Sequence, residues 1–74
     1  MTVIDVAATG NNLRTMCISA GVTPKDMQDA CGLTTRNAVY KWFNGTAVPN
    51  IDNLVIIADV LGTTIDKIIC IKRY

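Results

Sequence analysis

The stretch that decides the fold runs from Met27 to Pro49 and reads MQDACGLTTRNAVYKWFNGTAVP. Gly32 marks a tight turn after a short helix, because glycine readily adopts the left-handed conformation in which helices end. Thr34 and Thr35 follow and offer hydroxyls that can cap a second helix. Gly45 is well placed to end that second helix. The stretch therefore predicts a helix, a turn, a second helix and a loop.

The second helix is predicted over residues 35–44 and is amphipathic. Val39, Trp42 and Phe43 recur at helical spacing and are expected to face inward. The opposite face carries polar side chains: Arg36, Asn37, Tyr40 and Lys41. Two helices joined by a short glycine-containing turn form a helix-turn-helix motif, whose second helix lies in the major groove of DNA. Arg, Asn and Lys read base edges there, so residues 35–44 are interpreted as a recognition helix.

The charge of the chain supports this interpretation only locally. A short amphipathic helix with two basic residues is usually a solvated surface helix, and the net charge of +1 is small for a nucleic-acid-binding protein. However, all six acidic residues are aspartates, and none lies between Leu33 and Asn50. The predicted recognition face is therefore basic within a nearly neutral chain. We expect DNA binding with modest non-specific affinity.

Length and composition exclude several other classes of protein. A chain of 74 residues, half of them hydrophobic, builds one modest core and one domain. Three cysteines without CxxC spacing, and no histidine, favour buried thiols in a reducing cytoplasm over disulfides or a zinc site. No apolar run approaches the roughly 20 residues of a membrane span. Because no base accompanies a nucleophile and no phosphate-binding loop is present, we expect no enzyme, metal, cofactor or small-molecule substrate.

The first two helices are predicted from their capping residues. The first begins after Gly10 with Asn11 as its cap, and Gly21 ends it. Thr23 caps the second, and Pro24 occupies its first turn, where the missing N–H costs nothing.

The chain beyond Pro49 predicts two more helices. Asn50 or Asp52 starts the fourth helix and Gly62 ends it, with a core stripe of Ile51, Leu54, Ile57, Ala58 and Leu61. A last short helix carries Ile65, Ile68 and Ile69. Five short helices joined by short loops indicate a compact all-α domain.

Residues 1–9 are predicted to form either a disordered arm or a short strand, and in the second case the two ends of the chain pair as a small two-stranded sheet. Apolar residues alternate in both segments, and a lone pair of strands is marginal in water, so the pair is expected to lie on the helices. We divide the chain into an N-terminal arm (1–9), a DNA-binding domain (10–69) and a C-terminal tail (70–74).

The run from Gly10 to Ile69 resembles the Cro/phage-repressor (XRE) family of helix-turn-helix domains. An ordered set of short motifs carries the resemblance: Leu13-Arg14, Thr23-Pro24-Lys25-Asp26-Met27, Cys31-Gly32-Leu33, Val39-Tyr40-Lys41-Trp42, Asn44-Gly45, Pro49 and Leu54–Gly62. The resemblance implies a five-helix, lambda-repressor-like fold. It also implies a sequence-specific transcriptional regulator of phage or bacterial repressor type.

The resemblance implies site residues as well. Three side chains fall where family members contact bases: Arg36, Asn37 and Lys41. Five fall where members contact phosphates or the groove wall: Thr34, Thr35, Tyr40, Asn44 and Thr46. Pro24 stands where many members bind a phosphate through Gln, so that contact is expected either to be missing or to be made by Lys25 instead.

Three positions depart from the family pattern. Gln28 replaces a small Ala where the two motif helices cross, which implies a wider crossing or an outward-swung side chain. The span from Gly32 to Gly45 is one residue longer than in common members, which leaves the register of Thr34–Asn37 open by one residue. Phe43 stands where the family often has an acid.

Two functions follow as alternatives. The first is the DNA-binding regulator, with double-stranded DNA and a second copy of the chain as partners, joined either in free solution or only on DNA. The fourth helix, fifth helix and tail would then form the dimer interface. The second is a protein-interaction module of antitoxin or antirepressor type, with DNA contact secondary or lost. The acid-free helix favours the first, and the near-neutral charge favours the second.

Overall fold

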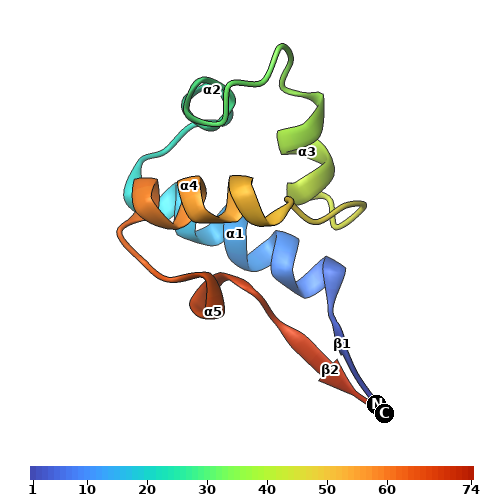
Figure 1. Cartoon of the computed structure of the whole chain (residues 1–74). Coiled ribbons are helices and arrows are strands. Elements are labelled where there is room, and N and C mark those ends of the chain that lie inside the picture. Colours follow the sequence, from blue (N-terminus) through green and yellow to red (C-terminus); the bar gives the residue numbers. More distant parts are fainter.

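The computed structural model describes residues 1–74 and contains five helices and two strands. In chain order these are β1 (Thr2–Ile4), α1 (Val6–Ala20), α2 (Pro24–Ala30), α3 (Asn37–Phe43), α4 (Ile51–Leu61), α5 (Ile65–Ile68) and β2 (Ile71–Arg73). Figure 1 shows α1 and α4 crossing the middle of the molecule, with α2 and α3 at one end and the paired termini at the other. The predicted five-helix architecture is confirmed.

One apolar cluster holds the helices together, and every helix contributes to it. Its members are Leu13, Cys17, Met27, Val39, Trp42, Leu54, Ile57, Ala58 and Ile68. Trp42 is only 5% exposed, so its indole belongs to the core, as its spacing from Val39 predicts. Burying these side chains supplies most of the driving force for folding.

The predicted helix ends are confirmed where local hydrogen bonds determine them. Thr23 Oγ1 accepts a hydrogen bond from the backbone N–H of Asp26, whose carboxylate accepts one from the N–H of Thr23. This capping box, chiefly through the Thr23 hydrogen bonds, also lowers the pKa of the Asp26 carboxyl. Asn50 caps α4. Gly21 and Gly62 end α1 and α4 with φ of +71° and +65°.

The start of α1 differs from the prediction. Asp5 Oδ1 accepts a hydrogen bond from the N–H of Ala8 at 3.0 Å, so Asp5 rather than Asn11 caps this helix. Gly10 is buried in the helix interior, where a Cβ would collide with the carbonyl oxygen of Trp42. Glycine therefore serves the close approach of α1 and α3 at this position, rather than breaking the helix.

The prediction for the apolar stripe of α4 is also wrong at one residue, Ile51. Ile51 is 67% exposed, whereas Leu54, Ile57 and Ala58 are buried. Helical side chains lean towards the N-terminus of the helix. The side chain of Ile51, the first residue of α4, therefore projects past the end of the helix and away from the core.

The two termini pair as predicted, but they do not lie along the helices. β1 and β2 are antiparallel, with Val3 opposite Lys72, and Figure 1 shows the pair projecting beyond the helical body. Its base is anchored by buried Thr9, whose hydroxyl donates to the Cys70 carbonyl at 3.3 Å and accepts from the Cys70 N–H at 2.9 Å. Asn12 Nδ2 also donates to the Lys67 carbonyl at 2.9 Å. The Thr9 hydrogen bonds thus tie the base of the strand pair to α1, and the Asn12 hydrogen bond ties α5 to α1.

Candidate nucleic-acid interface

The central motif consists of α2, the connection over residues 31–36, and α3. Gly32 turns the chain with φ of +66°. Thr35 Oγ1 then accepts a hydrogen bond from the N–H of Asn37 at 3.3 Å, and Arg36 occupies the cap position of α3 without capping it by its side chain. The helix is therefore shorter at both ends than the predicted 35–44, because it starts after this threonine and stops before the left-handed Gly45.

All nine residues predicted to contact DNA are exposed. They are Lys25 in α2, Thr34, Thr35 and Arg36 in the connection, Asn37, Tyr40 and Lys41 in α3, and Asn44 and Thr46 after it. Helical spacing places Asn37, Tyr40 and Lys41 on one side of α3. The other side carries Val39 and Trp42, which are buried in the core.

Gln28 makes the link between α2 and the start of α3. Its Oε1 accepts a hydrogen bond from Arg36 Nε at 3.1 Å, and its Nε2 donates to the Leu33 carbonyl at 3.4 Å. The Gln28 side chain therefore extends towards the turn and the start of α3. Arg36 consequently has an intramolecular partner that its position in the sequence does not indicate.

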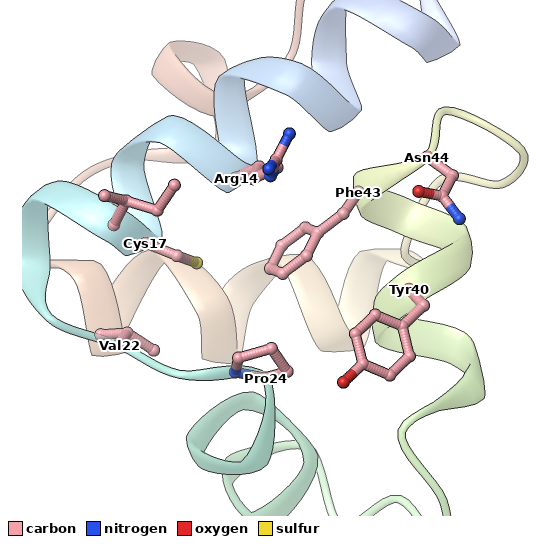
Figure 2. A pocket seen from close by; sticks show the side chains of 8 residues that line it. Arg14, Cys17, Val22, Pro24, Tyr40, Phe43 and Asn44 are labelled. Atoms are coloured by element: carbon pink, nitrogen blue, oxygen red, sulfur yellow. The ribbon is translucent and has the colours of Figure 1, made fainter.

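A pocket of about 380 Å³ lies between α1, the start of α2 and α3. It is lined by Arg14, Cys17, Ile18, Val22, Pro24, Tyr40, Phe43 and Asn44. Figure 2 shows the Phe43 ring pointing into this space and the Tyr40 ring on the side of Pro24. Tyr40 thus lies beside Pro24 at the edge of this pocket. Phe43, at the position where the family often has an acid, gives the pocket an apolar floor.

Arg14 is a residue that the sequence analysis did not assign to the site. It is exposed on α1 and lines the same pocket as Tyr40 and Asn44. The one feature of the sequence that distinguishes Arg14 is that it is the only basic residue before Lys25. Its cation therefore adds to the positive charge beside the exposed face of α3.

Cys17 and Cys31 occupy apolar surroundings. Cys17 is buried, and burial raises the pKa of its thiol to about 11. Burial also raises the pKa of the Cys31 thiol. All three cysteines are free thiols, and no group of three or more His, Cys, Asp or Glu side chains is arranged to hold a metal ion. A protonated, buried thiol is a poor nucleophile, so Cys17 serves packing.

No helix has the length and apolar character needed to cross a membrane.

Comparisons with known proteins agree with this geometry. The model of the family described as Helix-turn-helix matches residues 13–68. No curated relative matches the chain. The restriction-modification controller protein C.AhdI from Aeromonas hydrophila is similar in structure, with a TM-score of 0.76 and 20% sequence identity over 86% of this chain and 96% of that one. At this identity the likeness shows the fold. The chain belongs to the helix-turn-helix family of Cro/phage-repressor (XRE) type, whose members are DNA-binding transcriptional regulators.

Proposed function

We propose that this protein is a sequence-specific regulator of phage or bacterial repressor type that places α3 in the major groove of its operator. The observation that carries the proposal is the division of α3 into two sides. Val39 and Trp42 fix the helix to the core, while Asn37, Tyr40 and Lys41 are exposed. A rigidly held helix with free polar side chains meets the geometric requirement for reading base edges.

The exposed residues divide into two roles in this proposal. Arg36, Asn37 and Lys41 reach base edges, because they stand at the start and on the outward side of α3. The remaining side chains meet the phosphate backbone and fix the register of the protein on DNA: Lys25, Thr34, Thr35, Tyr40, Asn44 and Thr46. We add Arg14 to the second group, because it borders the same pocket as Tyr40 and Asn44.

Selection of bound sequences from a random DNA pool tests the proposal directly. A regulator of this kind should enrich one motif, and the enriched duplex should outcompete a scrambled duplex of equal length and composition. Recovery of no motif, with equal binding of both duplexes, would contradict sequence recognition. That result would favour the protein-interaction module instead.

Lys25→Ala should weaken binding to all DNA sequences alike. Lys25 is exposed near the N-terminus of α2 and its ammonium is assigned to a phosphate. Losing one phosphate contact lowers the slope of log K against log salt by about 1. Titrations at several salt concentrations measure that slope. Lys67→Ala on α5, outside the residues proposed to contact DNA, is the charge-matched control once sedimentation shows that it associates as the wild type does. A changed base preference in Lys25→Ala would contradict the assignment.

We further propose that two copies of the chain bind the operator together. Four aliphatic side chains of α4 lie outside the buried cluster: Ile51, Val55, Ile56 and Val60. Ile71 and Tyr74 of the tail are exposed as well. A second copy packed against α4, α5 and the tail would cover these surfaces. The resulting two-fold symmetric dimer would bind two DNA half-sites about 34 Å apart.

Val60→Asp should therefore weaken association and operator affinity while leaving the melting temperature nearly unchanged, because Val60 is 40% exposed in the single chain. Sedimentation of the free protein and of the operator complex measures the number of copies. Ser19→Asp, which adds the same charge at an exposed position of α1, is the control. One copy per operator at all concentrations, on a site without palindromic character, would contradict the dimer.

A further inference from the structure

The hydrogen bonds of Gln28 single out Arg36 among the polar residues of the interface. Gln28 is half-buried on α2, and its amide spans the connection to the residue that precedes α3. Its oxygen holds the Nε–H of Arg36 at 3.1 Å, while its nitrogen is tied to the Leu33 carbonyl at 3.4 Å. The guanidinium of an exposed arginine is thereby fixed to the body of the protein.

This contact leaves a defined part of the guanidinium free. Arginine carries five N–H donors in a planar fork, and the Nε–H is the only one that Gln28 occupies. Of the four N–H groups on the two terminal nitrogens, one lies on the same edge as the bonded Nε–H, and two form a parallel pair at the far end of the planar group, which Gln28 leaves free. Two parallel donors in this arrangement match the O6 and N7 acceptors of guanine in the major groove.

The location of Arg36 agrees with such a contact. Arg36 is the cap residue of α3, and the N-terminal residues of a recognition helix contact base edges. A free arginine loses side-chain entropy when a base immobilises it. An arginine already held by Gln28 has lost part of that freedom before DNA arrives.

We propose that Gln28 is a positioning residue that presents Arg36 to a guanine and so sets the base preference at one operator position. The inference rests on the proposed function, because it requires α3 to lie in the major groove. Gln28 itself is neutral and is assigned no contact with DNA. Its contribution is therefore specificity at one base pair, whereas Lys25 contributes affinity at every sequence.

The experiment is a four-member cycle of wild type, Gln28→Met, Arg36→Ala and the double variant. Each protein binds the selected operator and the same duplex with the guanine recognised by Arg36 replaced by adenine. That guanine is identified as the position at which Arg36→Ala loses its preference. The ratio of the two affinities is measured, because overall changes in affinity cancel in it. Gln28→Met keeps the length of the side chain but removes both hydrogen bonds.

Gln28→Met should reduce the guanine preference about fivefold. It should leave the salt slope unchanged, because no charge is lost. In the Arg36→Ala background the same substitution should have no further effect on the ratio. Gln28→Glu retains the acceptor for Arg36 and should keep the preference, which separates orientation of Arg36 from any loss of folding in Gln28→Met.

Three results would overturn the inference. These are an unchanged guanine preference in Gln28→Met, a tighter operator complex in that variant, or an equal loss of preference with and without Arg36. A tighter complex would mean that Gln28 holds Arg36 away from DNA. A wild-type protein that prefers no sequence would instead contradict the proposed function itself, so the two failures are distinguishable.

Discussion

Gly10→Ala should lower the free energy of unfolding by about 2 kcal/mol and the melting temperature by about 10 °C. A Cβ at Gly10 would collide with the Trp42 carbonyl oxygen and lie 3.1 Å from the Gly45 backbone nitrogen. Both obstacles are backbone atoms, so the methyl group is accommodated only if α1 and α3 move apart. Alanine gains up to about 1 kcal/mol in helix propensity over glycine, which offsets only part of this cost.

Asn11→Ala is the matched control for this prediction, because Asn11 is the exposed neighbour of Gly10 in the same helix. Its melting temperature should equal or slightly exceed that of the wild type, since alanine is the best helix former. Thermal unfolding followed by circular dichroism measures both variants. A Gly10→Ala curve that superimposes on the wild type would show that the two helices do not approach this closely.

Gly10 also shows which features of the fold the sequence could predict. Capping residues act within three or four positions of themselves, so Thr23, Asn50 and the terminal glycines of the helices could be identified from local chemistry alone. The role of Gly10 depends on a carbonyl more than thirty residues away, at Trp42. A glycine that permits close helix packing has the same local pattern as one that ends a helix, which is why α1 was predicted to start too late.

In the candidate site, too, features set by nearby residues could be predicted from the sequence, and features set by tertiary contacts could not. The exposure of the nine predicted residues could be anticipated, because helical periodicity separates them from Val39 and Trp42. The bond from Arg36 to Gln28 crosses from one helix to the next and has no periodic signal. Arg14 reaches the site only because α1 packs against α3, a tertiary arrangement that spacing does not encode.

The double variant Arg36→Ala/Lys41→Ala should abolish preferential binding to the selected operator. Each side chain is assigned to a base edge, and such contacts contribute about 1–3 kcal/mol each, so the pair should cost about 2–6 kcal/mol if the two act independently. Both residues are exposed, so the fold should be retained and the melting temperature should change little. Competition between the selected operator and a scrambled duplex measures the preference.

The control must remove the same charge without touching the residues proposed to contact DNA. Lys67→Ala/Lys72→Ala does so, because Lys67 in α5 and Lys72 in β2 lie at the opposite end of the molecule from α3 (Figure 1). Both residues belong to the surface proposed for the second copy, so sedimentation must first show that this variant associates as the wild type does. This control should weaken binding to both duplexes slightly, through long-range electrostatics, and leave their ratio unchanged. An Arg36→Ala/Lys41→Ala protein that keeps the wild-type ratio would exclude these two side chains as base readers. A matching loss in the control would show that charge alone, rather than the position of the two residues on α3, accounts for binding.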